Sequence, residues 1–293
     1  MITALCGTNG ALTFQASVSG IAIYLDNFAI KVLAKDQSSL RQRFITAVQR
    51  GADLLFSTAH AVEIVGPLGG STDAVKKFLD DLGPHWYPVE FLVFDVVKRE
   101  SEGASPDKSC FAGELLTSYF ASHTSGYHSG SGKVIDLSER FFRLGNFVDW
   151  LAPERDSFRA SCAQLDSTVE EAVGRLRAKA KKDPSWLDKV IPQSKFDPSK
   201  AATFAVATLM RNLVSDRGYR LKKGDGIDFC HAVMASSFAN FATLDKQWKR
   251  RVEGFPKPNR ETRIYYEPEL GLMMEDIEAA LDQLAKMNRI PRA

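Results

Sequence analysis

The sequence contains little cysteine, and its other missing features exclude several classes of protein. The four cysteines, Cys6, Cys110, Cys162 and Cys230, lie far apart and form no CxxC pair. A disulfide-rich secreted domain is therefore not expected. No stretch approaches roughly 18 consecutive apolar residues, so we expect no membrane-spanning helix. The N-terminal segment lacks the basic region that opens a signal peptide. We therefore expect a reduced, cytoplasmic protein.

Several catalytic motifs are also missing. The five histidines show no HExxH motif and no zinc-finger spacing, and no GxSxG elbow occurs. The glycine-rich segment 66–70 lacks the Gly-Lys-Ser/Thr ending of a phosphate-binding loop. The net charge is only +2, so the overall charge does not indicate a polyanionic partner. Zinc proteases, α/β hydrolases and P-loop nucleotide hydrolases are all disfavoured.

The apolar residues alternate between strand and helix patterns along much of the chain. Apolar runs predict strands at 21–26, 52–57, 240–244 and 263–266. Helical spacing predicts helices at 38–51, 72–83, 199–214, 227–238, 246–252 and 275–287. This order favours an α/β fold in three layers, with a parallel central sheet and helices on both faces.

The middle of the chain has a different character. Segments 101–109 and 122–133 are rich in serine and glycine and are predicted to be loops. Segments 136–150 and 154–182 have helical patterns, and three prolines follow in a polar stretch. We therefore predict a discontinuous α/β domain over 1–102 and 201–293. Residues 103–200 are predicted to form a mainly helical insertion.

Four acidic residues occur at the ends of apolar runs. They are Asp26, Glu63, Asp228 and Asp245. In open α/β sheets ligands bind outside the carboxyl ends of the strands, and carboxylates there suit hard divalent cations. Each acid also has a structural explanation, because Asp is a good helix N-cap and complements the positive end of a helix. Asp225 shares a helix start with Asp228 and competes with it for the same role.

These residues resemble the motifs of PIN-domain ribonucleases. The matching segments are Tyr24-Leu-Asp26-Asn, Ser57 through Glu63, Asp228-Phe-Cys-His-Ala and Thr243-Leu-Asp245-Lys. Two departures from the family are Asn27, where a small hydroxyl residue is usual, and the long spacer between Glu63 and Asp228. The resemblance covers about 20–100 and 200–266.

The resemblance implies a metal-dependent nuclease that uses Mg²⁺ or Mn²⁺. Asp26, Asp228 and Asp245 would bind the metal directly, and Glu63 would complete the site or position the attacking water. Asp225 is the reserve ligand. Thr243 would orient Asp245 or donate a hydrogen bond to a phosphate.

Basic residues flank the predicted acids. One group follows Asp245 and consists of Lys246, Lys249, Arg250 and Arg251, with Trp248 among them; another, Arg220, Lys222 and Lys223, precedes Asp225. A third group lies at 175–182. Such charges are often only a solvated helix face. Beside an acidic site they are expected to bind phosphates, and Trp248 is expected to stack on a base.

The predicted function is therefore a metal-dependent endoribonuclease acting on RNA. One alternative is a structure-specific DNA nuclease of flap-endonuclease type, and another is an inactive PIN scaffold that acts as a binding module. From the family resemblance we also expect an antitoxin-like inhibitor protein as a partner and the formation of a homo-oligomer. We expect no association with a membrane. The apolar stripe of the last helix is expected to lie in the core or at a subunit interface.

Overall fold

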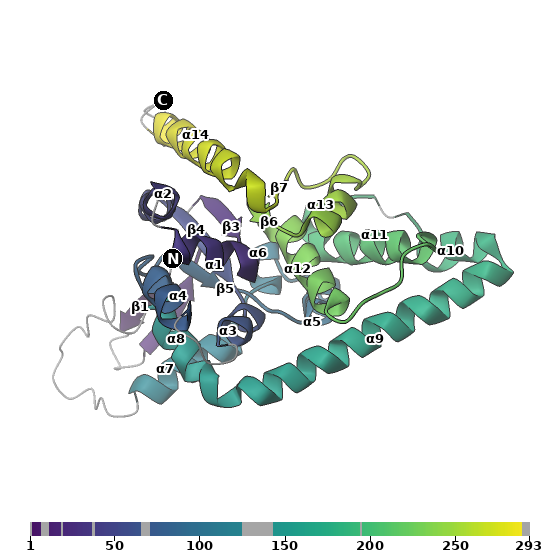
Figure 1. The fold of residues 1–293 in the computed structure, drawn as a ribbon, viewed down its shortest axis with the longest axis horizontal. Helices are drawn as coiled ribbons and strands as arrows, with labels where there is room; N and C mark the ends of the chain where they lie inside the picture. The colour runs from purple at the N-terminus through teal and green to yellow at the C-terminus, as the bar shows by residue number, and fades with distance from the viewer. Residues whose placement is uncertain are drawn as a thin grey trace. The chain divides into compact units, whose positions relative to one another are not determined.

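The computed structural model describes residues 2–6, 12–18, 20–36, 39–65, 71–124, 143–193 and 195–288. Its contacts divide the chain into two units (Figure 1). The first unit comprises Met1–Val89, Phe111–Arg155 and Glu267–Ala293, and the second comprises Glu90–Cys110 and Asp156–Tyr266. These boundaries differ from the expected division at residues 102 and 200, which stays a prediction.

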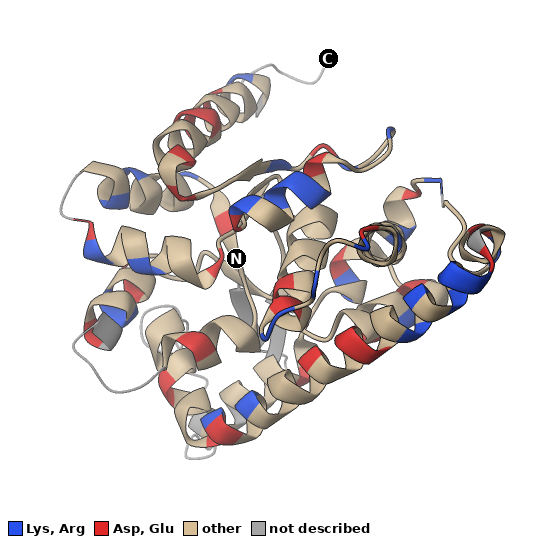
Figure 2. Ribbon diagram, turned by 45° about the vertical axis from the view of Figure 1, so that its right-hand side comes forward, with Lys and Arg blue, Asp and Glu red and all other residues tan. Residues whose placement is uncertain are grey.

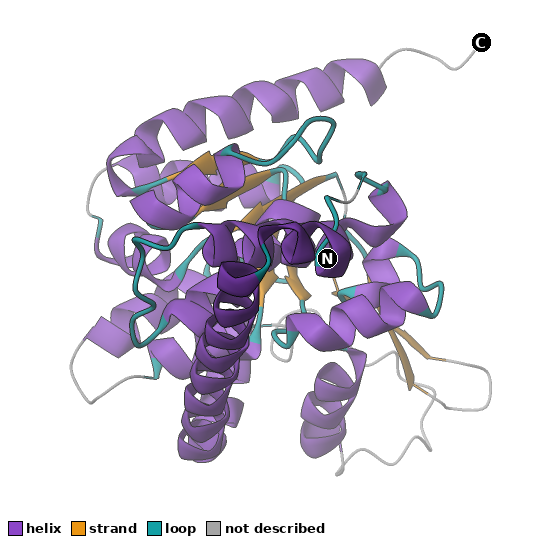
Figure 3. Ribbon diagram, turned by 90° about the vertical axis from the view of Figure 1, so that its right-hand side faces the viewer, coloured by secondary structure: helices purple, strands orange, loops and turns teal. Residues whose placement is uncertain are grey.

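The expected parallel sheet is present. It has five strands in the order β5-β4-β3-β6-β7, and β1 and β2 form a separate antiparallel pair. Strand β3 pairs with β4, β4 with β5, and β6 with β7, all in parallel. Helices separate the successive strands of this five-stranded sheet along the chain. Figure 3 distinguishes the helices from the strands by colour. This arrangement is consistent with a three-layer α/β fold.

The first unit contains strands β1 to β5 and helices from both ends of the chain. The strands are β1 (Ile2–Cys6), β2 (Leu12–Ala16), β3 (Ile21–Tyr24), β4 (Ala52–Phe56) and β5 (Trp86–Pro88). The helices are α1 (Asn27–Lys35), α2 (Ser39–Gln49), α3 (Thr58–Ile64), α4 (Ser71–Asp80), α7 (Gly113–Thr124), α8 (Leu144–Leu151) and α14 (Leu270–Asn288), with short η1 (Ala152–Glu154) and η3 (Glu267–Glu269).

An aromatic cluster forms part of the core of the first unit. Trp86 and Phe147 are fully buried, with ring centroids 5.2 Å apart, and Tyr119 meets Phe147 edge-on at 5.3 Å. Every residue of β3 and β4 is buried, as expected for parallel strands covered on both faces. The apolar stripe of α14 is buried as well, including Met274 and Ile277 at 0% exposure. This stripe therefore belongs to the core.

The second unit contains two short strands and a group of packed helices. The strands are β6 (Phe241–Thr243) and β7 (Arg263–Tyr265). The helices are α5 (Val93–Ser101), α6 (Pro106–Ser109), α9 (Arg155–Lys182, from Asp156 on), α10 (Pro184–Val190), α11 (Ala201–Ser215), α12 (Asp225–Phe238) and α13 (Lys246–Glu253), with η2 (Pro198–Lys200). Helix α12 is buried along nearly its whole length.

Carboxylates from other helices satisfy the starts of α11 and α12. The Glu100 carboxylate, 1% exposed, accepts from the backbone N–H groups of Ala202 and Thr203 at 2.9 and 2.8 Å. The Asp166 carboxylate accepts from the N–H groups of Gly224 and Gly226 at 2.6 and 2.7 Å. The first turn of a helix leaves its N–H groups without intrahelical partners and attracts negative charge. These two acids therefore hold α5 against α11 and α9 against α12.

Arginines satisfy the opposite ends of the same two helices. The Arg177 guanidinium donates to the carbonyls of Leu213 and Asp216 after α11, at 2.7 and 2.8 Å. Arg260 donates to the carbonyls of Phe238 and Ala239 after α12, at 3.0 and 3.1 Å. Cations are favoured where a helix leaves carbonyls unsatisfied. Arg177, one of the cations expected to form a solvated or phosphate-binding group, therefore has a structural role.

Most expected elements are confirmed within one or two residues. The long helix expected at 154–182 is α9, and the expected strand at 240–244 is β6. Residues 125–142 lie outside the described residues, and they include parts of the loop expected at 122–133 and of the helix expected at 136–150. In the described part of the chain, no helix has the length and apolarity needed to cross a membrane.

The close approach of α9 to α12 depends on Gly226. A Cβ atom at Gly226 would lie 2.7 Å from the Asp166 Cα atom, a contact that requires one backbone to move. We predict that Gly226→Ala lowers the free energy of unfolding by about 1–3 kcal/mol, the usual cost of overpacking a core. Denaturant unfolding measures this change.

Gly174→Ala in α9 is the matched control. A Cβ atom there meets nothing within 4 Å, so the better helix propensity of Ala should raise stability by about 0.5–1 kcal/mol. Equal effects of the two substitutions would contradict a tight contact at Gly226.

Candidate functional site

Asp26 lies where strand β3 turns into helix α1. It is the N-cap of α1, with extended backbone (φ −66°, ψ 162°), and its Oδ1 accepts from the Ala29 N–H at 2.9 Å. The side chain is partly buried. A carboxylate that caps a helix with one oxygen can still present the other oxygen to a ligand. Asp26 therefore occupies the expected edge of the sheet and also has the expected structural role.

Glu63 lies in the last turn of α3, the helix that follows β4. Its side chain is half-buried. Burial raises the pKa of the Glu63 carboxyl to about 7, the nearby Lys31 ammonium opposes this shift, and the Asp26 carboxylate adds to it. Lys31 and Asp26 therefore lie near enough to Glu63 for their charges to act on its carboxyl group.

A buried histidine connects the two turns that carry these acids. His60, 0% exposed, has Nε2 at 2.8 Å from the carbonyl of Leu25, the residue before Asp26. Its Nδ1 accepts from the Ser57 N–H at 3.0 Å, at the start of α3. A carbonyl can only accept and a backbone N–H can only donate, so the ring is neutral with its hydrogen on Nε2. His60 is a positioning residue that the sequence analysis did not assign.

The sequence analysis also missed a buried acid in β4. Asp53 is 0% exposed, and its Oδ1 lies 4.0 Å from Nδ1 of His85. It lies near the amino end of β4, away from the carboxyl end where Ser57 begins α3. A single acid within an apolar strand was the available sequence signal.

Asp225 serves the local structure at the start of α12. It is 6% exposed and accepts from the Tyr219 hydroxyl at 2.8 and 2.7 Å and from the Lys222 N–H. Burial and this bond to Asp225 raise the pKa of the Tyr219 phenol to about 12. Because both of its oxygens already accept hydrogen bonds, Asp225 has little capacity left to bind a metal ion.

Asp228 and Asp245 occupy the expected positions in the second unit. Asp228 lies in the first turn of α12 and is half-buried. Asp245 is an exposed N-cap that follows β6 and accepts from the Trp248 N–H at 2.7 Å. Its backbone (φ −61°, ψ 162°) closely matches that of Asp26 (φ −66°, ψ 162°). The same strand–Leu–Asp–helix turn therefore occurs once in each unit.

Two residues expected to contact substrate lie in the interior. Thr243 and Trp248 are each 1% exposed. The Trp248 ring meets Phe229 edge-on at 6.3 Å. Our expectation that Trp248 stacks on a nucleic-acid base is wrong for this structure, because the apolar face of α13 packs inward and carries the ring with it.

The basic residues that follow Asp245 lie along α13, where Figure 2 colours them blue. Lys246 and Arg250 are exposed, whereas the side chains of Lys249 and Arg251 are only 15% and 11% exposed. Lys246 and Lys249 place their Nζ atoms 5.9 and 5.2 Å from the centre of the Tyr266 ring, and Lys249 also lies 3.6 Å from Glu253. One shallow depression is lined by Asp216, Lys246, Gln247, Arg250 and Arg251. Lys222 and Lys223 are exposed on the turn before α12.

Metal binding depends on how many acids converge. Among the described residues, no group of three or more His, Cys, Asp or Glu side chains is arranged to hold a metal ion. The pair Asp26 and Glu63 lies within the first unit. Mg²⁺ commonly binds through one or two carboxylates, completing its shell with water and substrate phosphates. A Mg²⁺ or Mn²⁺ ion held by Asp26 and Glu63 would therefore need water and substrate phosphates to complete its coordination shell.

Comparison of the chain with protein-family models, with curated proteins and with solved structures found no match. The role of the candidate site is therefore inferred from the chemistry of its own residues.

The raised pKa of Glu63 makes stability depend on pH. The pKa rises from 4.5 to about 7 on folding, so the folded state binds this proton more tightly than the unfolded chain does. Stability is therefore lost as pH rises from about 4.5 to 7, by about 2–3 kcal/mol for a partly solvated group. Glu63→Gln mimics the neutral form, so we predict that it is more stable than the wild type at pH 8 by about this amount.

Denaturant unfolding at pH 5 and pH 8 tests this prediction. The stability difference between Glu63→Gln and the wild type should nearly vanish at pH 5. Glu114→Gln, at an exposed acid in the first turn of α7 in the same unit, is the control and should show no such pH dependence. A pH-independent difference at Glu63 would contradict the raised pKa.

Proposed function

We propose that the protein is a metal-dependent nuclease of PIN type that hydrolyses RNA. The observation that supports this most directly is the pair Asp26 and Glu63 in the first unit. Two partly buried carboxylates that repel each other are costly to keep ionised, and a bound cation offsets that cost. A strongly perturbed carboxyl group such as that of Glu63 is typical of functional sites.

The local structure supports a role beyond capping. Strands β3 and β4 are parallel neighbours, with Tyr24 beside Leu55, so Asp26 and α3 both follow the carboxyl ends of adjacent strands. Ligands bind at this edge in open α/β sheets. His60 holds the two turns together through Leu25 and Ser57. The acids are therefore positioned by a rigid, buried contact.

When bound, Mg²⁺ or Mn²⁺ would acidify a water molecule and stabilise developing charge on the phosphate oxygens. Asp26 and Glu63 would hold the ion through carboxylate oxygens. A Glu63 carboxyl with a pKa of about 7 can also exchange a proton at its Oε atoms near neutral pH, and thus accept one from the attacking water. The Lys31 ammonium would offset negative charge beside the pair.

The second unit contains the other two predicted acids and would bind the nucleic-acid strand. We propose Asp228 and Asp245 as its metal-binding carboxylates, on the sequence resemblance. Lys246, Arg250 and Arg251 line one depression, and such cations bind phosphates with an affinity that falls as salt rises. Lys222, Lys223 and Lys249 would extend this surface. Asp225 would act through Tyr219 and the turn at Lys222 rather than as a ligand.

A cleavage assay with matched strands tests the proposal. The purified chain is incubated with single-stranded RNA and with DNA of the same sequence, in Mn²⁺, in Mg²⁺ and in EDTA. We expect metal-dependent cleavage of RNA. Asp26→Asn should reduce the rate by about 100-fold or more with an unchanged melting temperature, because Asn caps a helix as well as Asp does.

Asp197→Asn is the control for the chemical change. Asp197 is an exposed cap whose Oδ1 accepts from the Ser199 N–H at 2.9 Å, and this variant should cleave at the wild-type rate. Asp228→Asn and Asp245→Asn test the second unit separately. Cleavage that survives in Asp26→Asn, or that proceeds in EDTA, would rule out the proposed metal site.

Preferential cleavage of DNA in the same assay would favour the DNA nuclease instead. One observation favours the inactive scaffold: Asp26 and Asp245 each serve as a helix cap, which explains their presence without catalysis. Absence of cleavage in every lane, together with no shift of the melting temperature on adding Mn²⁺, would establish that alternative over the nuclease.

A further inference from the structure

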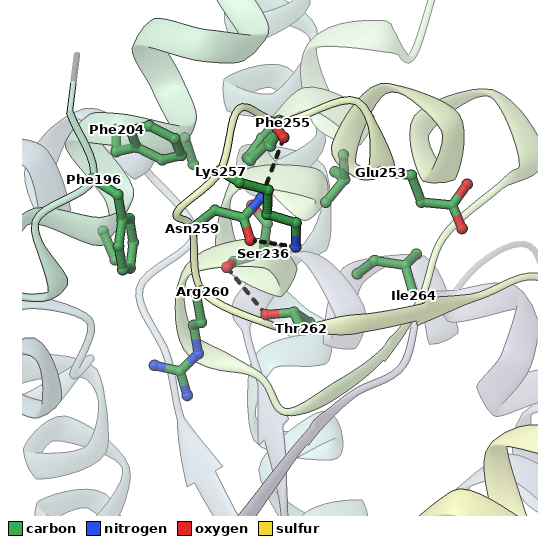
Figure 4. A pocket seen from close by; sticks show the side chains of 13 residues that line it. Phe196, Phe204, Ser236, Glu253, Phe255, Lys257, Asn259, Arg260, Thr262 and Ile264 are labelled. Carbon is green, nitrogen blue, oxygen red and sulfur yellow. Dashed lines mark hydrogen bonds between the residues drawn. The ribbon is translucent and has the colours of Figure 1, made fainter.

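The second unit contains a cavity that the proposed nuclease site does not use (Figure 4). Its volume is about 160 Å³. Its lining comes from the segment around Phe196, from α11, from α12, from α13, from β7 and from the stretch between α13 and β7. All of these belong to the same unit. None of the four predicted metal-binding acids lines it.

One wall of the cavity is aromatic. Phe204 and Phe255 are 4% and 7% exposed, and Phe196 is half-buried. The rings of Phe196 and Phe204 lie 5.3 Å apart at 77°, and those of Phe204 and Phe255 lie 5.8 Å apart at 81°. A dry cavity of about 150 Å³ holds one benzene ring. This space therefore matches a single aromatic ring rather than a drug-sized molecule.

The other side of the cavity is polar, with an excess of positive charge. Lys257 is exposed and donates from Nζ to Asn259 Oδ1 at 3.0 Å, while Asn259 Nδ2 reaches the Phe255 carbonyl only at 3.4 Å. An amide oxygen accepts two hydrogen bonds and an amide nitrogen donates two. Asn259 can therefore offer one donor and one acceptor to the edge of a ring.

The charges around the cavity favour an anionic group on the ligand. Arg260 lines the cavity while it holds the end of α12, and the one lining acid, Glu253, lies 3.6 Å from Lys249. Two cations thus face one acid that already has its own counter-ion. An aromatic wall, an amide and surface cations are the groups with which proteins bind unstacked bases and their phosphates.

We propose that this cavity binds a pyrimidine base that carries a phosphate, supplied either by a single strand or by a free nucleotide. The base would lie against the aromatic wall formed by Phe196 and Phe204, with its edge toward Asn259. Its phosphate would lie at the mouth near Lys257. Binding in this cavity requires no cleavage, so its test is independent of the test of the proposed nuclease activity.

Calorimetric titration of the full chain in EDTA tests this proposal, with uridine 5′-monophosphate, uridine and ribose 5-phosphate as probes. We expect uridine 5′-monophosphate to bind with a dissociation constant on the order of 0.1 mM. Uridine should bind more weakly, and ribose 5-phosphate should not bind measurably. Equal binding of ribose 5-phosphate and uridine 5′-monophosphate would overturn the proposal, because it would show that no base is recognised.

Variants locate the binding. Ala205 is a lining residue 1% exposed, so Ala205→Leu fills the cavity and should abolish binding while the chain stays folded. Phe196→Ala should weaken binding about tenfold. Lys257→Ala should weaken the binding of uridine 5′-monophosphate roughly two- to fivefold and leave the binding of uridine unchanged. Lys189→Ala, at an exposed lysine of α10, is the matched control and should change neither.

A short oligouridylate distinguishes the two sources of the base. Binding at least tenfold tighter than the monophosphate, lost in Ala205→Leu, would identify a strand, whereas binding of the monophosphate alone would identify a free nucleotide. Unchanged affinity in Ala205→Leu would overturn the proposal. Asp26→Asn should bind the probes normally, which separates this site from the nuclease.

Discussion

Backbone N–H groups at the starts of helices impose the constraint on which much of this structure depends. A buried helix start leaves donors that cost about 1–3 kcal/mol each when they find no acceptor. Carboxylates from outside the helix satisfy this requirement repeatedly: Asp26 at α1, Asp80 at α8, Glu100 at α11, Asp166 at α12 and Asp245 at α13. Three of these acids come from a different helix, so the same hydrogen bonds fix how helices pack. At two of these contacts there is no room for a Cβ atom, which would lie 2.6 Å from the Asp80 Oδ1 atom at Gly145 and 2.7 Å from the Asp166 Cα atom at Gly226.

This use of acids determines how the candidate site is interpreted. A carboxylate at the edge of the sheet can cap a helix, bind a cation or do both, and Asp26 and Asp245 have the geometry of caps. Glu63 differs because it lies in the last turn of α3, where a negative charge is unfavourable to the helix. Its burial beside Asp26 raises its pKa to about 7. The placement of Glu63 therefore favours a functional explanation more than the placement of the two caps does.

Cations also have dual roles in the second unit. Arg177 and Arg260 satisfy the carbonyls at the ends of α11 and α12, and Arg251 lies over the Tyr219 ring at 4.7 Å while bonding Asp216 at 2.9 Å. Lys246 and Arg250 remain exposed on α13. The depression beside these residues and the aromatic cavity are lined by different residues, and α13 contributes to both. One short helix thus supplies basic residues to the depression and part of the lining of the aromatic cavity.

The sequence alone determined the local structure, because apolar periodicity and strand-to-helix order follow from neighbouring residues. It predicted the parallel sheet, the long helix α9 and the helix starts at Asp26 and Asp245. It also placed Asp26 and Glu63 after adjacent strands. Only the tertiary structure decided that Trp248 lies in the core, that His60 joins Leu25 to Ser57, and that Asp225 is held by Tyr219. These features depend on which faces of the helices and strands pack together and on how burial affects charged side chains. Contacts between residues distant in the sequence determine both.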